Sequence, residues 1–343
     1  FKDIFIDEVN SKHANDNDKV IVVIDRYDPE EDNPEGHVTE VIGNKGAVGV
    51  DITAIAKQFN LPDKFSEKTL AEVKRLPEEV SDEDREGRED LRNIFTVTID
   101  GADAKDFDDA ISIEKHEDNF YLYVHIADVT HYVREGSAID KDAYERGNSV
   151  YLLDRVIPML PVELSNGLCS LNPGVDRLSV TTKIELDKEG EILKSDFYLS
   201  VINSNYRLVY TDVSDYIENG RKFSEDTELL KNIDLMNELY KILAEKRAER
   251  GTIEFEFPEP YIKLDADGKP ISIEPEERRT ANSIIEEFMI LNNQVIGSYF
   301  SEKHVPFIYR VHDDPKIERV EKLNNALRAF RYNTISEVPE PEE

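Results

Sequence analysis

An aspartate-rich segment, TIDGADAKDFDDAISIE at residues 98–114, constrains this chain more than any other feature. It places four acidic side chains within one short stretch: Asp100, Asp106, Asp108 and Asp109. The flanking runs FTVTI and AISI have the apolar, β-branched character of strands. Neighbouring side chains of a strand point to opposite faces, so the four carboxylates can converge only if residues 101–109 form a folded loop. Gly101 is expected to supply backbone freedom near its start.

Carboxylates gathered this closely repel one another, so some must be protonated or cations must neutralise them. An all-oxygen cluster without Cys or His favours Mg²⁺, or Mn²⁺, over Zn²⁺. Magnesium held by a few carboxylates completes its shell with water and substrate phosphates, which indicates phosphoryl chemistry. The four aspartates are therefore candidate metal ligands and catalytic residues. The competing interpretation is a solvated acidic turn, which the number and framing of the aspartates make the weaker one.

Two calcium-loop interpretations fail on spacing. At the aspartate cluster, Ala110 and Ile111 stand where an EF-hand would require a ligand and a glycine. The later segment DADGKPISIE has partial calcium-loop spacing, but Lys263 occupies the first ligand position and the flanks resemble strands. A hairpin turn at Asp267 and Gly268 is predicted instead.

The pattern along the chain predicts an α+β protein with more than one part. Residues 1–55 contain short alternating runs, DIFID, DKVIVVIDRY and GHVTEVIG, typical of part of a small antiparallel barrel or sheet. Residues 56–94 are helical in spacing and strongly charged, with Ser66 as an N-cap and Ser81 with Asp84 as a capping box. We expect a solvated helical connector there. Residues 95–343 mix strands with long helices around SEDTELLKNIDLMNELYKILAEKRAERG and TANSIIEEFMILNNQVIGSYFSEK.

Composition limits the partners. The chain has 42 Lys and Arg against 74 Asp and Glu, a formal charge of −32, which repels polyanions at long range and favours metal ions or basic partners. The lone Cys169 excludes an internal disulfide and is expected to be a small core residue. His125 and His131 lie without a third ligand nearby and are expected to be structural. No signal peptide or membrane-spanning run is visible, so a soluble, cytoplasmic monomer is expected.

Several blocks resemble the catalytic domain of the ribonuclease II and ribonuclease R exoribonucleases, and ribonuclease R in particular. They occur in the family's order over most of residues 95–315: the aspartate segment, YVHIADVTHYV, RGNSVYLLDRVIPMLPVELSNGLCSLNP, VDRLSVT, RLVYTDVSDYIENG, SIIEEFMILNN and PFIYRVHDDP. Residues 1–55 resemble the latter part of the OB-like cold-shock domain that precedes catalysis in that family. The resemblance implies a mixed α/β catalytic domain over residues 95–343.

The resemblance implies processive, Mg²⁺-dependent hydrolysis of single-stranded RNA from its 3′ end to nucleoside 5′-monophosphates. The four aspartates match the family's active-site aspartates. Tyr151 matches a tyrosine that packs near the 3′-terminal nucleotide, and Tyr210 and Glu286 match residues that contact or clamp terminal bases. Without the resemblance, these two tyrosines would be ordinary core aromatics and Glu286 a charge on a helix surface.

The family's catalytic domain normally continues into a Ser-Pro-Ile-Arg-type motif, whose arginine lies near the scissile phosphate, and the chain does not contain it. The S1 domain and the first cold-shock domain are also absent, so we expect a fragment of an exoribonuclease, C-terminally incomplete. Such a chain is expected to bind metal but to turn over weakly or not at all. The alternative is a catalytically silent relative or engineered scaffold that binds protein partners.

Overall fold

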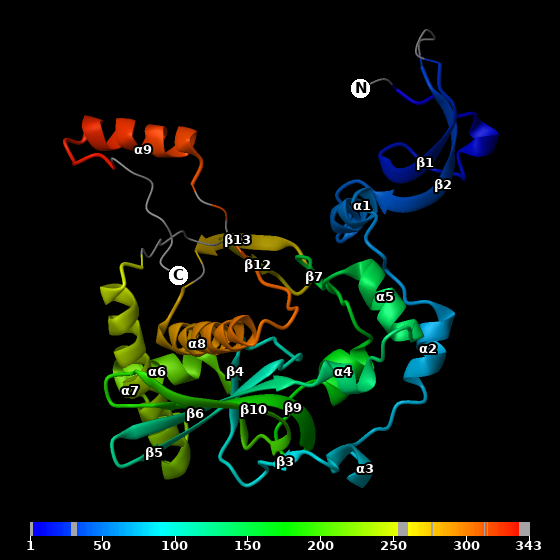
Figure 1. Ribbon diagram of the computed structural model, residues 1–343. Helices are drawn as coiled ribbons and strands as arrows, with labels where there is room; N and C mark the ends of the chain where they lie inside the picture. The colour runs from blue at the N-terminus through cyan, green and yellow to red at the C-terminus, as the bar shows by residue number, and fades with distance from the viewer. Residues whose placement is uncertain are drawn as a thin grey trace. The chain divides into compact units, whose positions relative to one another are not determined.

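The computed structural model describes residues 3–28, 33–252, 260–275, 277–311, 313 and 315–335. The chain divides into two compact units, Phe1–Asn292 and Asn293–Glu343. No described helix combines the length and the apolar character that a membrane crossing requires. Figure 1 shows the course of the chain with its helices and strands labelled.

The N-terminal part is rich in sheet, as predicted. Two strands pair antiparallel with irregular register: β1 (Asp18–Arg26) and β2 (Glu35–Asn44). They are followed by α1 (Val50–Gln58). The additional strand predicted over residues 3–7 is wrong, because Phe5 alone forms a bridge, to Glu35, before a 3-10 turn at Glu8–Asn10 ends the extended segment.

The predicted helix starts of the connector are confirmed. α2 (Glu67–Val73) begins after Ser66, whose hydroxyl accepts a hydrogen bond at 3.2 Å from an amide in the first turn. α3 (Asp82–Arg85) begins with the predicted capping box, in which the Ser81 and Asp84 side chains accept from each other's backbone amides. Each cap satisfies amides that have no partner inside the helix.

The connector is less solvated than its charge predicts. Val73, Val80 and Leu91 are buried in a hydrophobic cluster that also includes residues of the central sheet. Within the same segment, β3 (Glu89–Asp90) pairs in parallel with the edge of the central sheet. A high average charge does not exclude burial of a few apolar positions, and it is these that attach the segment to the core.

A seven-stranded sheet organises the rest of the first unit, in the order β11-β4-β5-β6-β9-β10-β3. All pairs are antiparallel except β11 with β4 and β10 with β3. The three strands predicted after residue 95 are confirmed as β4 (Val97–Asp100), β5 (Asp109–His116) and β6 (Asn119–Ala127). The remaining strands are β9 (Asp176–Leu186), β10 (Ile192–Asn203) and β11 (Tyr206–Val209).

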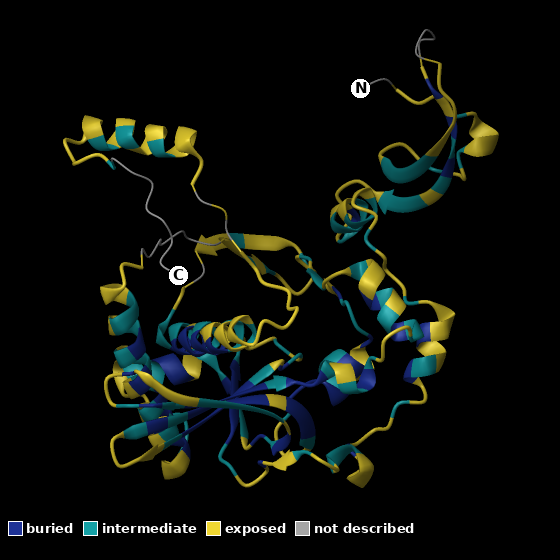
Figure 2. Ribbon diagram, in the orientation of Figure 1, coloured by how far each residue is buried: buried dark blue, intermediate teal, exposed yellow. Residues whose placement is uncertain are grey.

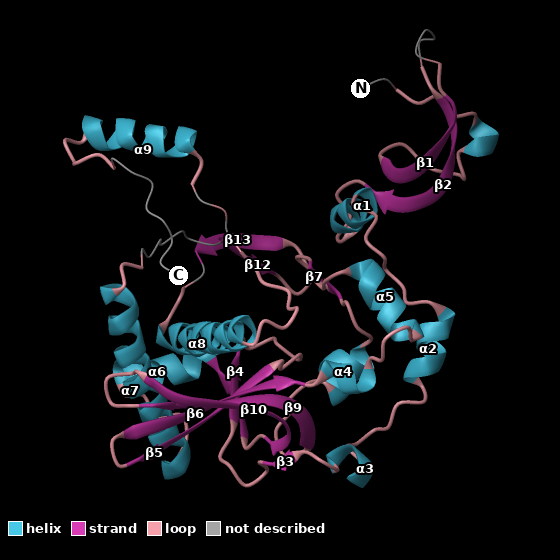
Figure 3. Ribbon diagram, viewed as in Figure 1, coloured by secondary structure: helices cyan, strands magenta, loops and turns pink. Residues whose placement is uncertain are grey.

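Helices and short hairpins make up the other regular elements of the described chain, and α9 belongs to the second unit (Figure 3). The two predicted long helices are confirmed as α7 (Thr227–Glu249), which packs against β5, and α8 (Thr280–Glu302). The other helices are α4 (Val129–Tyr132), α5 (Ala138–Arg146), α6 (Tyr210–Asn219), α9 (Ile317–Ala329) and the π-helical turn η2 (Glu163–Leu168). The hairpins are β7 (Val150–Tyr151) with β8 (Val156–Ile157), and β12 (Pro260–Leu264) with β13 (Pro270–Pro275).

The β12–β13 hairpin confirms the turn predicted at Asp267 and Gly268. Gly268 has φ of 79°, a left-handed conformation that glycine adopts without strain. The Asp265 carboxylate accepts hydrogen bonds at 2.9 Å from the amides of Asp267 and Lys269. That carboxylate therefore stabilises the turn, as an Asx motif does.

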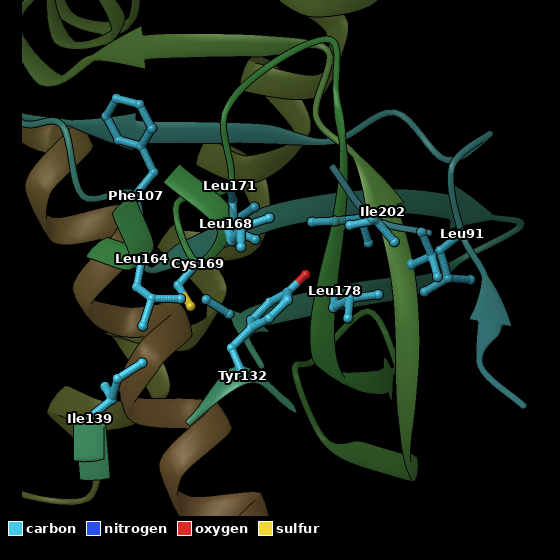
Figure 4. Close-up of a cluster of buried hydrophobic side chains, with 14 of the residues drawn as sticks. Leu91, Phe107, Tyr132, Ile139, Leu164, Leu168, Cys169, Leu171, Leu178 and Ile202 are labelled. Carbon is cyan, nitrogen blue, oxygen red and sulfur yellow. The ribbon is translucent and has the colours of Figure 1, made fainter. Parts of the chain in front are cut away.

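A hydrophobic cluster lies between the sheet and the η2 segment (Figure 4). Phe107, Leu164, Leu168 and Leu171 belong to it, and Cys169 is buried among them as predicted. In Figure 2 the strands of the sheet include long buried stretches. The cluster includes a residue of the aspartate loop itself, so packing of the core and placement of the loop are linked.

His125 belongs to a buried polar chain in the sheet. Its Nε2 lies 3.0 Å from the Ser112 hydroxyl and its Nδ1 lies 2.8 Å from the Thr181 hydroxyl. Burial lowers the pKa of His125 to about 3, so the ring is neutral at physiological pH. His131 lies instead 2.8 Å from the carboxylate of Asp84 in α3. Both contacts agree with the structural roles expected for these histidines.

Candidate active site

The aspartate segment forms a loop between two antiparallel strands, as predicted. Asp100 is the last residue of β4, and Asp109 is the first residue of β5. Asp106 and Asp108 lie in the intervening residues, which belong to neither strand. The reversal of the chain thus brings both ends of the segment to the same edge of the sheet.

Three residues from two neighbouring segments hold this loop in place. The Ser170 hydroxyl accepts from the Phe107 amide and donates to the Lys105 carbonyl, both at 3.0 Å, so it satisfies the backbone on either side of Asp106. The Leu171 amide donates to the Phe107 carbonyl at 2.8 Å, and the Ala127 amide donates to the Asp108 carbonyl at 2.9 Å. Because backbone groups of a partly buried loop need partners, these contacts determine its path.

Gly101 does not have the role expected from the sequence. Its φ is not among the positive values, and a Cβ built on it would meet no atom within 4 Å. The turn there is instead closed by a 3.2 Å hydrogen bond from the Ala104 amide to the Gly101 carbonyl. The path of the loop depends on contacts from outside it rather than on glycine.

The carboxylates form an electrostatically coupled set. Burial raises the pKa of Asp100 to about 7, with a further increase from Asp109 and an opposing effect from Arg207. Burial, and then Asp108, raise the pKa of Asp109 to about 6. The pKa of Asp108 is also raised, first by desolvation of its carboxyl and then by Asp106. Carboxylates close enough to disfavour each other's ionisation lie in a single site.

Both predicted tyrosines lie at these carboxylates. The Tyr151 hydroxyl donates to Asp106 Oδ2 at 2.8 Å, while 67% of the residue is exposed, which excludes an ordinary core aromatic. Tyr210 begins α6 immediately after β11, whose last residue, Val209, pairs with Asp100. Burial, followed by the charges of Asp100 and Asp109, raises the pKa of Tyr210 to about 12.

Glu286 is placed differently. It lies exposed on α8 and forms an ion pair with Arg278, on the segment before that helix. No hydrogen bond or ion pair within the described part of the chain joins Glu286 to the four aspartates. The next residue, Glu287, is buried and pairs with Arg247 of α7.

Arg207 also belongs to the site, although no sequence pattern predicts it. Its Nη2 donates to the carbonyls of Gly101 and Ala102 at 2.6 and 2.9 Å. It stands three residues before Tyr210, but an isolated arginine in a short strand carries no distinguishing signal. Only the parallel pairing of β11 with β4 reveals that its side chain reaches the loop.

The carboxylate set fits a hard divalent cation in its chemistry. Asp100 Oδ2 is buried without a hydrogen-bond partner, and the mutual repulsion of the carboxylates would be relieved by a positive ion. Among the described residues, no group of three or more Asp, Glu, His or Cys side chains is arranged so that it could hold a metal ion by itself. An ion held here would therefore need oxygens from water or substrate as well, which is the usual arrangement for magnesium.

The raised pKa of Asp100 predicts a pH-dependent gain of stability in Asp100→Asn. Folded Asp100 retains its proton up to about pH 7, whereas the unfolded residue loses it near 3.8. The metal-free native chain therefore loses stability as pH rises from about 4 to 7. Thermal or urea unfolding at pH 8 in EDTA should find the variant more stable by about 1–2 kcal/mol, after allowance for solvent screening. At pH 4 the two should be equal.

Asp103→Asn is the matched control, because it removes the same charge from an exposed position of the same loop. Mg²⁺ should stabilise the unaltered chain and the control more than Asp100→Asn. Equal stability of all three chains at pH 8 would show that Asp100 carries no electrostatic penalty.

The fold and site together define a chain with a sheet-rich N-terminal part and a seven-stranded sheet that carries a group of carboxylates where β4 ends and β5 begins. Residues 88–341 match the family model of the RNB domain, and residues 1–66 match that of a cold shock domain. The chain therefore belongs to the RNB-domain family.

Relatives of known name and solved structures support the same family. Ribonuclease R of Thermotoga maritima is 42% identical over 332 residues, which are 96% of this chain and 47% of that protein. Ribonuclease R 2 of Lactococcus lactis is 43% identical over 315 residues, 90% of this chain and 47% of that protein. The structure of Mycoplasma genitalium RNase R in complex with double-stranded RNA matches with a TM-score of 0.91 and 28% identity, over 100% of this chain and 60% of that one. The chain thus spans about half the length of these curated relatives.

Proposed function

We propose that this chain carries the hydrolytic centre of a Mg²⁺-dependent 3′→5′ exoribonuclease that acts on single-stranded RNA. The observation that carries the proposal is the set of electrostatically coupled aspartates between the end of β4 and the start of β5. This set occurs in a member of the RNB-domain family. Asp100, Asp106, Asp108 and Asp109 would hold the metal, whose positive charge would attract the scissile phosphate. A bound magnesium ion would supply charge neutralisation at phosphate oxygens and acidify a bound water.

The two tyrosines support a substrate that ends at the carboxylates. Tyr151 presents an exposed ring whose hydroxyl is fixed to Asp106, so its position relative to the carboxylates is defined. Tyr210 adds a second aromatic group beside Asp100 and Asp109. Aromatic faces stack on any base with about 1–3 kcal/mol each, which suits an enzyme that must accept every sequence. Glu286 would contact the RNA from α8 rather than from the carboxylate set.

The charge of −32 affects how this activity should be measured. Binding of a polyanion to such a chain depends on local cations and on metal ions. Contacts between local cations and phosphates are strongest at low ionic strength, where the repulsion from the net charge is also least screened, so saturating Mg²⁺ is needed under these conditions.

The decisive experiment compares linear and circular RNA of one sequence at low salt with Mg²⁺. A 5′-labelled linear strand should shorten stepwise from its 3′ end and release nucleoside 5′-monophosphates, whereas the circle, which has no end, should stay intact. Cleavage of the circle would identify an endonuclease. Shortening by this chain should be slow, as expected of a catalytic domain without the Ser-Pro-Ile-Arg-type motif. No shortening at all by a folded chain that binds Mg²⁺ would show that these residues do not suffice for turnover, and would contradict the proposal for this chain.

A further inference from the structure

Arg207 contacts both ends of the aspartate loop. At the start of the loop, its Nη2 donates to the carbonyls of Gly101 and Ala102, at 2.6 and 2.9 Å. Towards the end of the loop, the centre of its guanidinium lies 5.5 Å from the centroid of the Phe107 ring, within the range of a cation–π contact. Arg207 thus bridges residues that lie on either side of Asp106.

The sheet explains how one side chain reaches this position. β11 and β4 run parallel, and Arg207 pairs with Thr98, two residues before β4 ends at Asp100. β11 is the edge strand beside β4, so a long side chain at this point can extend to the loop that follows β4. A flat guanidinium can donate to adjacent carbonyls and still present a face to an aromatic ring, which an ammonium group cannot do in the same way.

The loop has few other external supports. Ser170 holds the backbone around Asp106, and the amides of Leu171 and Ala127 hold Phe107 and Asp108. None of these three reaches the segment directly after Asp100, where the Gly101 and Ala102 carbonyls accept from Arg207. That segment determines how the last carboxylate of β4 faces those of the loop.

We propose that Arg207 is a positioning residue of the carboxylate site: it fixes the 101–107 loop from the β11 side and so sets the arrangement that binds the divalent cation. This inference deepens the proposed function and rests on the same carboxylates. It does not require contact between Arg207 and RNA.

A positioning role and a purely electrostatic role predict opposite effects on metal affinity when Arg207 is replaced. Its positive charge would repel a nearby cation, so a purely electrostatic role predicts tighter metal binding when the charge is lost. A positioning role predicts weaker binding, because groups that orient metal ligands typically contribute about 10–100-fold in affinity. Arg207→Gln and Arg207→Lys separate the two, since lysine keeps the charge but cannot reproduce the guanidinium contacts.

The experiment uses the 343-residue chain and Mn²⁺ as the probe, without RNA. Mn²⁺ affinity is measured by calorimetry, and amide hydrogen exchange of residues 101–108 is measured in EDTA. Both Arg207→Gln and Arg207→Lys should weaken Mn²⁺ binding by about tenfold or more. Both should also speed exchange in the loop by about tenfold, as expected for lost backbone hydrogen bonds.

Arg92→Gln is the control. It removes an arginine from the opposite edge of the sheet, where Arg92 pairs with Asp90 and Asp176. Its Mn²⁺ affinity and loop exchange should match the unaltered chain, so a general effect of lost charge would be visible. Ser170→Ala is a positive control, because it removes the hydroxyl that binds the loop backbone at Lys105 and Phe107. It should also speed amide exchange in the loop.

Tighter Mn²⁺ binding in Arg207→Gln with unchanged binding in Arg207→Lys would overturn the positioning role in favour of a charge effect. Values within twofold of the unaltered chain in both variants would also overturn it. If Arg207→Gln fails to fold, the Mn²⁺ affinity of Arg207→Lys alone tests the positioning role. A loss of about tenfold supports it, and a value within twofold of the unaltered chain overturns it. Neither readout uses RNA, so an inactive chain would count against the proposed function without affecting this test.

Discussion

Asp109→Asn is expected to reduce Mg²⁺-dependent shortening of RNA by about 10²–10³-fold or more, the range that loss of one strong electrostatic contact to a transition state produces. Asp109 is the first residue of β5 and belongs to the coupled carboxylate set, since burial and Asp108 raise its pKa to about 6. Asparagine has nearly the same shape but removes the negative charge that a divalent cation requires. The rate of 3′ shortening of a labelled strand at saturating RNA measures the effect.

Asp103→Asn is again the matched control, because it changes an exposed aspartate of the same loop in the same way. It should retain activity within a few-fold of the unaltered chain. If both variants lose activity equally, the effect comes from the total charge of the loop rather than from a specific ligand. If Asp109→Asn remains as active as the control, Asp109 is not part of the hydrolytic centre.

Glu287→Ala should destabilise the chain by about 3–5 kcal/mol, the cost typical of removing one partner of a buried ion pair. Glu287 is 4% exposed on α8, and its carboxylate lies 3.1 Å from Nε of Arg247 on α7. Removing it takes this negative partner away from a largely buried guanidinium, so that Glu287 no longer offsets the cost of desolvating it. Urea unfolding followed by circular dichroism, at constant pH and salt, measures the difference.

The neighbouring Glu286→Ala provides the contrast. Glu286 is exposed and paired with Arg278, and exposed ion pairs contribute about 0–1 kcal/mol. Its substitution should leave the unfolding free energy nearly unchanged and should instead weaken retention of RNA. A stability loss as large as that of Glu287→Ala would show that the pair on the helix surface is structural, and would remove the reason to assign Glu286 to RNA.

Patterns over neighbouring residues were sufficient to predict much of the secondary structure. The strands on either side of the aspartate segment, the caps at Ser66 and Ser81, the long helices α7 and α8 and the Asp267–Gly268 turn were all predicted from residues that lie close together in the chain. Each depends on side-chain periodicity or on hydrogen bonds between near neighbours, which sequence displays directly.

Predictions failed where the outcome depended on distant segments. The connector was expected to be solvated, yet Val73, Val80 and Leu91 reach the core, because burial depends on which surface a residue meets after folding. Gly101 was expected to shape the loop, but Ser170 and Arg207 hold it from elsewhere.

The sequence by itself predicted where the site lies: four aspartates in an apolar frame can converge only as a folded loop, and such a cluster favours bound cations or protonation over unrelieved repulsion. The tertiary structure decided which other residues lie next to the four aspartates. Tyr210 and Arg207 reach the carboxylates because β11 pairs in parallel with β4, a strand more than a hundred residues earlier. Strand order follows from how the whole sheet buries its faces, and no local period of the sequence encodes it.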